Sequence, residues 1–190
     1  MAAKKSGNRL RIIGGEWRSR FLPFPDVEGL RPTTDRIRET VFNWLQPVVP
    51  GANVLDMFAG SGALGFEALS RGAQSLTLLE MHAKAAKQLT ENVRTLKTEN
   101  AKVVQTDALT WLKQCEEKFD LIFLDPPFNK GLLPECLALI ESRNLLNPNA
   151  WIYIESEQDL SSLTLPSNWR LHRDKKAGQV RLSLYQAQGE

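Results

Sequence analysis

Three glycines that follow an apolar run ending in an acid mark the first place where this sequence could do chemistry. The residues are Val54-Leu55-Asp56-Met57-Phe58-Ala59-Gly60-Ser61-Gly62-Ala63-Leu64-Gly65. Their G-x-G-x-x-G spacing is typical of a strand, a tight turn and a helix start, where a ligand contacts bare backbone and helix N–H groups point at it. The motif predicts a nucleotide cofactor. The alternative is a turn in which the glycines serve packing alone.

Asp56 indicates which cofactor the glycines would serve. It stands at the carboxyl end of the expected strand, four residues before Gly60. The diphosphate of a dinucleotide needs donors and no nearby carboxylate, whereas S-adenosylmethionine carries sulfonium and ammonium cations that a carboxylate attracts. The acid therefore favours a methyl donor. A nicotinamide oxidoreductase is the competing enzyme class, because it shares the glycine spacing.

A second candidate site is Asp125-Pro126-Pro127-Phe128, directly after the apolar run 121–124. Two prolines fix the backbone and leave their carbonyls as acceptors without competing N–H groups. A carboxylate and a proline carbonyl could accept both hydrogens of a planar exocyclic amine while Phe128 stacks on its ring. Acceptors on both N–H bonds favour the pyramidal geometry in which the nitrogen attacks a methyl group in line. A purely structural turn is the alternative.

Strands and helices alternate from residue 53 onwards, which predicts an α/β fold with a mainly parallel sheet and crossover helices. We expect strands over residues 53–58, 75–80, 101–106, 120–125 and 150–155. Helices are expected near residues 62–71, 82–97, 108–115 and 132–142. The last segments, 169–176 and 180–186, flank a turn at Gly178 with no helix between them, which predicts an antiparallel hairpin added to the sheet.

Acids recur at the ends of successive expected strands, namely Asp56, Glu80, Asp107 and Asp125. Ligands bind at the carboxyl edge of open α/β sheets, so four converging acids indicate a site there. Glu80 stands where an acid takes the ribose hydroxyls of a cofactor, and Asp107, followed by Ala108, is placed to receive the adenine amine. A helix cap is the alternative reading of Asp107.

The amino-terminal part is basic, although the whole chain has a net charge of only +2. Residues 1–38 hold nine Lys and Arg residues against four acids, which favours contact with a polyanion such as nucleic acid. We expect a hairpin over residues 9–22 with a tight turn at Gly14-Gly15. Arginines interleaved with Trp17 and Phe21 would contact phosphates and stack on bases. In the alternative, Trp17 is buried and the hairpin caps the core.

A helix should begin within residues 31–39, with threonine and aspartate as capping candidates, and end before Pro47 and Pro50. Its apolar face would hold Ile37, Val41, Trp44 and Leu45. We place Arg36, Arg38 and Glu39 on the opposite face, which could meet a cofactor carboxylate or an RNA phosphate, or only solvent.

Length and composition set the limits of the fold. The 190 residues, 42% hydrophobic and 24% charged, suit one compact domain with a small appendage. We divide the chain into a basic hairpin extension over residues 1–30 and a catalytic domain over residues 31–190. Because no stretch approaches a membrane span and no apolar segment follows residues 1–6, we expect a cytoplasmic protein without membrane contact. Cys115 and Cys136 lack metal-ligand spacing, so we expect buried thiols and no metal.

The motifs resemble a known group of enzymes. Residues 56–62 together with 125–128 are similar to class I S-adenosylmethionine methyltransferases that act on exocyclic amines. Residues 11–15, 31–40, 60–65 and 178–180 resemble the bacterial RsmD family, the guanine-N2 methyltransferases of 16S ribosomal RNA. The resemblance covers nearly the whole chain. It implies a Rossmann-like, mainly parallel seven-stranded sheet with an antiparallel C-terminal hairpin, and S-adenosylmethionine as cofactor with S-adenosylhomocysteine as product.

The resemblance also implies roles for individual residues. The methionine and sulfonium part of the cofactor would be surrounded by Asp56, Phe58, Ala59, Gly60 and Gly62; its ribose and adenine would be held by Glu80, Met81, Asp107 and Ala108. The target guanine would be held and stacked by Asp125, Pro126, Pro127 and Phe128. From the charge and aromatic residues of the amino-terminal part, independently of the resemblance, we expect the RNA to meet Arg9, Arg11, Trp17, Arg18, Arg20 and Arg36. The implied partner is 16S ribosomal RNA, within the small subunit or an assembly intermediate, and the protein would be a monomer.

The base itself leaves alternatives open. A carboxylate is acceptor-only, so Asp125 suits the neighbouring N1–H and N2–H donors of guanine, yet it is also compatible with adenine. An adenine-N6 methyltransferase is therefore the nearest alternative. A non-catalytic RNA-binding assembly factor would share the basic end but has no use for a complete cofactor site.

Overall fold

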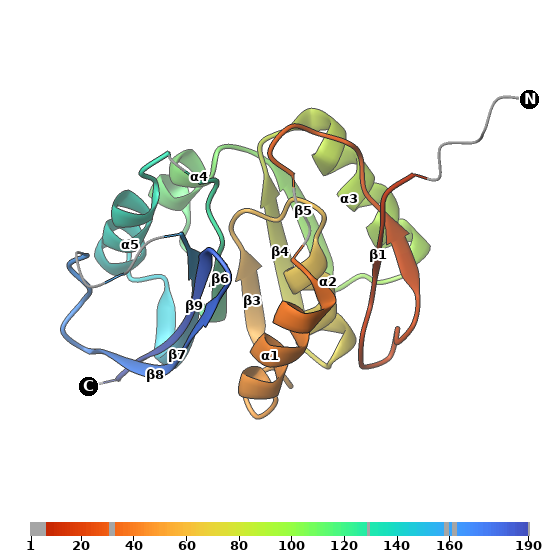
Figure 1. The fold of residues 1–190 in the computed structure, drawn as a ribbon. Helices are drawn as coiled ribbons and strands as arrows, with labels where there is room; N and C mark the ends of the chain where they lie inside the picture. The colour runs from red at the N-terminus through yellow and green to blue at the C-terminus, as the bar shows by residue number, and fades with distance from the viewer. Residues whose placement is uncertain (1–6, 31–32, 129, 158–159, 161–162, 190) are drawn as a thin grey trace, which may run out of the picture.

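The computed structural model describes residues 7–30, 33–128, 130–157, 160 and 163–189. Helices cover both faces of a central sheet, and a two-stranded hairpin packs at one end (Figure 1). No helix among the described residues is long and apolar enough to cross a membrane. In chain order the elements are β1 Arg9–Arg11, β2 Phe21–Pro23, α1 Asp35–Leu45, β3 Asn53–Asp56, α2 Ala63–Ser70, β4 Ser75–Glu80, α3 Ala83–Thr95, β5 Ala101–Gln105, α4 Ala108–Gln114, β6 Phe119–Leu124, α5 Leu133–Ser142, β7 Leu146–Ser156, β8 Trp169–Ala177 and β9 Val180–Ala187.

The central sheet has seven strands in the order β5-β4-β3-β6-β7-β9-β8. Strands β3 to β7 pair in parallel, while β9 runs antiparallel to both β7 and β8. The expected mainly parallel sheet with an antiparallel C-terminal hairpin is therefore confirmed. The chain builds outward from β3 in one direction through β4 and β5, then returns to add β6 on the other side. The topological switch point, where ligands bind in such sheets, lies between β3 and β6.

Most strand and helix bounds agree with the expected ranges within one or two residues, and the largest differences have local causes. Strand β3 ends at Asp56 instead of residue 58, because the chain turns there into a loop in which Gly60 and Gly62 have positive φ angles of 55° and 82°. Strand β7 begins earlier than expected, at Leu146, because Leu146 pairs with Phe119 before a register shift.

The central strands β3, β4 and β6 are buried on both faces, and their side chains belong to two hydrophobic cores. Val54, Leu78, Phe123 and Tyr153 belong to a core with α1, α2, α3 and the amino-terminal segment. The residues that alternate with them, including Leu55, Leu79, Ile122 and Ile152, pack with α4 and α5 on the other face. Continuous apolar strands are what a parallel sheet covered on both sides requires. Cys115 and Cys136 are buried free thiols, as expected.

The amino-terminal hairpin forms, but not with the expected tight turn. Strands β1 and β2 pair antiparallel with Leu10 opposite Leu22, and residues 12–20 form a long loop between them. The prediction of a Gly14-Gly15 two-residue turn is wrong, because these glycines instead let the loop approach the end of α2. The Glu16 N–H donates to the Ser70 carbonyl at 2.8 Å. A Cβ on Gly15 would lie 2.0 Å from that same oxygen.

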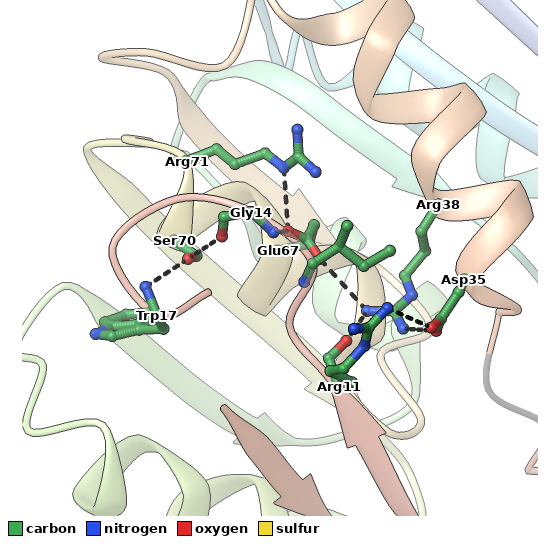
Figure 2. A network of polar contacts seen from close by, with 9 residues as sticks. Arg11, Gly14, Trp17, Asp35, Arg38, Glu67, Ser70 and Arg71 are labelled. Carbon is green, nitrogen blue, oxygen red and sulfur yellow. Dashed lines mark hydrogen bonds and ion pairs between the residues drawn. The ribbon is translucent and has the colours of Figure 1, made fainter. Parts of the chain in front are cut away.

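Glu67 of α2 anchors this loop from within the protein. Its side chain is fully buried and accepts hydrogen bonds from the N–H groups of Ile13 at 2.8 Å and Gly14 at 3.0 Å. Arg71 Nε at 3.0 Å and Arg38 Nη1 at 3.4 Å complete the contacts (Figure 2). The donors come from the loop, from α1 and from the end of α2, so Glu67 joins these three segments.

Arg38 was expected on the exposed face of α1, and this expectation is wrong because its side chain is buried. Its side chain is 2% exposed and donates to the Arg11 carbonyl at 2.6 Å and to Asp35 Oδ1 at 2.5 Å. Arg11 also pairs with Asp35 at 3.3 Å. The hydrogen bond from Arg38 to the Arg11 carbonyl and the Arg11–Asp35 pair hold α1 against the hairpin. Arg36, in contrast, is exposed.

Trp17 is buried, with 7% of its surface exposed. It packs in the core with Leu10, Ile12 and Leu22. Its backbone N–H donates to Ser70 Oγ at 2.9 Å. The alternative in which Trp17 belongs to the core is therefore the correct one, and its ring offers no surface on which a base could stack. The exposed aromatic ring of the hairpin is Phe21, over which the Arg9 guanidinium lies 5.0 Å from the ring centre.

The contact between Gly15 and α2 yields a stability prediction. We expect Gly15→Ala to lower the free energy of unfolding by roughly 2–4 kcal/mol, because the new methyl group combines a left-handed backbone with a direct clash. Gly29→Ala is the matched control, since Gly29 has the same φ of 79° but nothing within 4 Å of its Cβ position. It should cost only about 1 kcal/mol. Urea unfolding followed by circular dichroism measures both, and equal losses would contradict the packing role of Gly15.

Candidate active site at the carboxyl edge of the sheet

Three of the predicted acids meet at one edge and on one face of the sheet. Asp56 ends β3 and lies opposite Leu78 of β4 and Phe123 of β6. The neighbouring strands continue further, so that Glu80 and Asp125 rise on either side of Asp56. Because side chains alternate along a strand, all three acids share the face of Val54, Leu78 and Phe123. Figure 1 shows β3 flanked by β4 and β6 at the centre of the sheet.

The three glycines of the motif differ in how much space a side chain would have at each position. A Cβ on Gly62 would lie 2.5 Å from the Phe66 ring, and one on Gly65 would lie 2.8 Å from Leu78 Cδ2. The packing alternative therefore applies to these two positions. At Gly60 the nearest atom to a built Cβ is 3.7 Å away, on the Leu30 side chain. Gly60 thus presents open backbone at the sheet edge, where a ligand can approach.

Asp56 lies close to other carboxylates, and little hydrogen bonding or positive charge offsets its own negative charge. The side chain is 2% exposed, and its pKa is raised from 3.8 to about 7, first by burial and then by the charge of Asp125, while the Gly65 N–H lowers it and Glu80 raises it further. The Gly65 N–H donates to Asp56 Oδ2 at 3.1 Å. A cationic ligand at this position would relieve the repulsion, and an anionic one would increase it. The site therefore fits a cation.

Glu80 ties the glycine loop to the end of β4. Its Oε2 accepts from the Gly60 N–H at 2.8 Å and its Oε1 from the His82 N–H at 3.1 Å. Met81, between Glu80 and His82, exposes 62% of its surface, and Phe58 is partly buried within the loop after β3.

The structure places Asp107 at the amino end of α4, where its Oδ1 accepts from the Leu109 N–H at 2.9 Å. Asp107 is therefore a helix cap, and Ala108 is the buried first residue of that helix.

The Asp-Pro-Pro-Phe segment stands beside the glycine loop. Asp125 directly follows β6, the parallel neighbour of β3, and the Met57 N–H donates to the Phe123 carbonyl at 3.2 Å. Pro127 and Phe128 are exposed, Phe128 with 43% of its surface. Burial raises the pKa of Asp125 to about 6, while a hydrogen bond with Glu155 lowers it. The two candidate corners of the sequence are thus adjacent on one edge.

Glu155 is a residue of the site that the sequence analysis missed. Leu124 of β6 pairs with Ile154 of β7, so Asp125 and Glu155 follow side by side. Glu155 is 6% exposed and one of its oxygens, Oε2, has no hydrogen-bond partner among the described residues. Burial raises its pKa to about 9, and the charge and hydrogen bond of Asp125 contribute. The available signal was the same as for the other acids, since Glu155 closes an apolar expected strand.

The predicted RNA-contacting arginines lie around the hairpin and α1, away from the acids. Arg9 covers Phe21, Arg11 pairs with Asp35, and Arg20 donates to the Thr95 carbonyl of α3 at 3.2 Å. The side chains of Arg18 and Arg36 are exposed and make no hydrogen bond or ion pair within the described ranges. These two guanidinium groups are the ones most available to an anionic partner.

Several known proteins with similar sequence or structure are named methyltransferases. The chain is 54% identical to "Ribosomal RNA small subunit methyltransferase D" of Escherichia coli (strain K12), over 96% of this chain and 93% of that protein. It is 49% identical to the protein of the same name from Haemophilus influenzae, over 93% of each. A solved structure described as a putative methyltransferase from Escherichia coli has a TM-score of 0.88 and 52% identity, and covers 96% of this chain and all of that one.

The sheet order, the ligand edge and these likenesses together define a Rossmann-like class I methyltransferase, as the motifs led us to expect. A family model described as "Conserved hypothetical protein 95" matches residues 10–186. The chain belongs to this family, the RsmD family of methyltransferases.

The electrostatics of Asp56 predict how stability depends on pH. A carboxyl group whose pKa is higher in the folded state binds its proton more tightly when folded, so stability falls as pH rises between about 4 and 7. We expect Asp56→Asn to remove this loss while keeping an acceptor for the Gly65 N–H. The variant should gain stability relative to the original chain by up to about 1.4 kcal/mol per pH unit across that window.

Urea unfolding at pH 5 and pH 8 measures the effect, with the exposed Asp26→Asn as control. A difference between Asp56→Asn and the original chain that does not change with pH would contradict the electrostatic description of Asp56.

Proposed function

We propose that this protein transfers a methyl group from S-adenosylmethionine to the exocyclic N2 of one guanine in 16S ribosomal RNA. The observation that carries the proposal is the adjacency of the Gly60 corner and the Asp125 corner on parallel neighbours β3 and β6. A methyl donor held at the first corner and an amine held at the second would be close enough for direct transfer. The relatives named as ribosomal RNA small subunit methyltransferases support the choice of substrate.

The cofactor would lie along the loops that follow β3, β4 and β5. Its cationic part would be held by Asp56, Phe58, Ala59, Gly60 and Gly62, its ribose by Glu80 and Met81, and its adenine by Asp107 and Ala108. The raised pKa of buried Asp56 and the open backbone at Gly60 support this assignment, because a cation would hold Asp56 ionised. S-adenosylmethionine would supply an electrophilic methyl group. The residues of this chain would bind and orient both reactants and accept the proton.

The target base would be oriented by the Asp125 corner. The Asp125 carboxylate and the Pro126 carbonyl would accept the hydrogens of N2, and the exposed ring of Phe128 would stack on the base, with Pro127 fixing the turn. Two acceptors on one amine turn its lone pair toward the methyl donor. Asp125 would then take the proton that N2 gives up as it gains the methyl group.

The RNA would be guided to this edge by the basic amino-terminal part. In this proposal residues 1–30 serve mainly RNA contact and residues 31–190 form the catalytic domain. Arg9, Arg18 and Arg36 offer exposed guanidinium groups, and Phe21 offers the stacking surface that buried Trp17 does not. The partner would be the small ribosomal subunit or an assembly intermediate, met in the cytoplasm by a monomeric enzyme.

The role of Asp125 is testable by separating binding from chemistry. We expect Asp125→Ala to bind S-adenosylmethionine within about twofold of the original affinity but to lose methyl transfer by a factor of at least about 10²–10³. Calorimetry measures cofactor binding, and single-turnover incorporation of labelled methyl into unmodified small subunits measures transfer. Glu157→Ala, an exposed acid beyond β7, is the control.

Mass mapping of the labelled nucleotide tests the base. Methylation of an adenine would overturn the guanine assignment, and cofactor binding by the original chain without any transfer would favour an assembly factor. Transfer at the original rate by Asp125→Ala would remove Asp125 from the reaction.

Salt dependence tests the RNA surface. We expect Arg18→Ala and Arg36→Ala each to weaken binding of unmodified small subunits several-fold and to reduce the slope of log affinity against log salt by about 0.7–1 per phosphate contact. Lys102→Ala is the matched control, because Lys102 of β5 is also exposed but already pairs with Glu117 at 3.0 Å. Filter binding across a salt series gives the slopes. An unchanged slope in both arginine variants would contradict this surface.

A further inference from the structure

Glu155 has no structural explanation in the described part of the chain. It is buried at the carboxyl edge, between Asp125, which directly follows β6, and Leu182 of β9, with which it pairs in register. A buried acid costs stability that an apolar side chain of similar size would not. Its Oε2 has no partner among the described residues. Glu67, the other deeply buried glutamate, is instead saturated by donors.

The groups that face Glu155 leave it one suitable partner. Tyr153 lies two residues before it on the same face of β7, and its buried hydroxyl also lacks a described hydrogen-bond partner. Asp56 of β3 lies beyond Asp125, and Leu182 of β9 is apolar. The nearest cation on β9 is Arg181, one register position further along, where it pairs with Asp174 of β8. Among these groups, Asp125 is the one that shares a hydrogen bond with Glu155.

We propose that Glu155 is a positioning residue for Asp125: its protonated carboxyl group donates a hydrogen bond to the Asp125 carboxylate and holds it in the orientation that accepts the target amine. This inference rests on the proposed function of Asp125. Two carboxyl groups side by side cannot both ionise cheaply, so the pair keeps one proton. Glu155 holds that proton because it is the more deeply buried of the two. Asp125 therefore stays ionised and acceptor-only when the base arrives.

The proton that Glu155 and Asp125 share also determines where the proton released by the target amine goes. As N2 formed its bond to the methyl carbon, the sulfur–methyl bond would break and its electron pair would stay on the departing S-adenosylhomocysteine. An N2–H bond would then break and Asp125 would receive the proton, so the pair would hold two. The second proton leaves to water through the partly exposed Asp125. Glu155 never touches the substrate and its own proton stays in place throughout. Its contribution is to keep Asp125 both charged and correctly oriented between turnovers.

The pair predicts a pH profile with two limbs. The rate of transfer should fall below about pH 6, where Asp125 gains a proton, and above about pH 9, where Glu155 loses its own. Glu155→Gln keeps a donor toward Asp125 but has no proton to lose. We expect it to transfer methyl within about threefold of the original rate at pH 7.5 and to lack the alkaline limb.

Glu155→Leu removes the donor while keeping the volume. We expect its kcat to fall by about 10- to 100-fold with the KM for S-adenosylmethionine unchanged, and its acid limb to move to higher pH, because the hydrogen bond that lowers the pKa of Asp125 is lost. Rescue by Gln but not by Leu, together with the shifted limb, distinguishes positioning from a general loss of structure. Equal defects in both variants with an unmoved acid limb would overturn the proposal.

A measurement without substrate keeps this test separate from the proposed function. Carboxyl carbon NMR of the cofactor-free protein follows the titration of Asp125 directly. The Asp125 titration should move to higher pH in Glu155→Leu and stay close to its original position in Glu155→Gln. An Asp125 titration that is the same in all three proteins would overturn the pairing, whether or not methyl transfer is found. A shifted titration without any methyl transfer by the original chain would instead reject the proposed function alone.

Discussion

The site depends on one constraint, which is that β3 ends at Asp56 while its neighbours β4 and β6 continue. Asp56 lies opposite Leu78 of β4 and Phe123 of β6. Because both flanking strands extend beyond this level, the chain after Asp56 can turn through the glycine loop between their ends. Because all three strands are parallel, their carboxyl ends meet at the same edge, and side-chain alternation directs their acids to one face. The two candidate corners of the site are neighbours because of this arrangement.

Among the described residues, the buried acids form two groups that are compensated in opposite ways. Glu67 receives hydrogen bonds from Ile13, Gly14, Arg71 and Arg38, and it joins elements that lie far apart in the sequence. Asp56, Asp125 and Glu155 instead surround one another, and burial raises the pKa of each. The first centre stabilises the fold. The second one costs stability, which is expected where a cationic ligand and a proton-accepting carboxylate have to be accommodated.

The amino-terminal hairpin is at the same time a part of the core and a basic surface. Leu10, Ile12, Trp17 and Leu22 fill the core between α1, α2 and α3. Arg9 and Arg11 lie on either side of Leu10 on β1 and are exposed, because side chains alternate along a strand. Arg18 and Arg20 are exposed in the loop between the strands. The Asn92 side chain donates to the Pro23 carbonyl at 2.9 Å and fixes the hairpin to α3. An RNA contacting this surface would therefore meet a rigid element rather than a loose tail.

The sequence by itself determined the order of the elements, the parallel sheet and the place of the two corners. These follow from local features, namely apolar runs, glycine and proline positions, and the rule that parallel strands share a carboxyl edge. Only the tertiary structure decided that Gly15 packs on Ser70, that Arg38 and Trp17 are buried, and that Glu155 joins Asp125. Each of these depends on a contact between segments that are distant in the chain, such as Ile13 with Glu67, 54 positions apart. Local patterns predict which face of an element is apolar, but burial of one polar side chain is decided by the partner that folding brings to it.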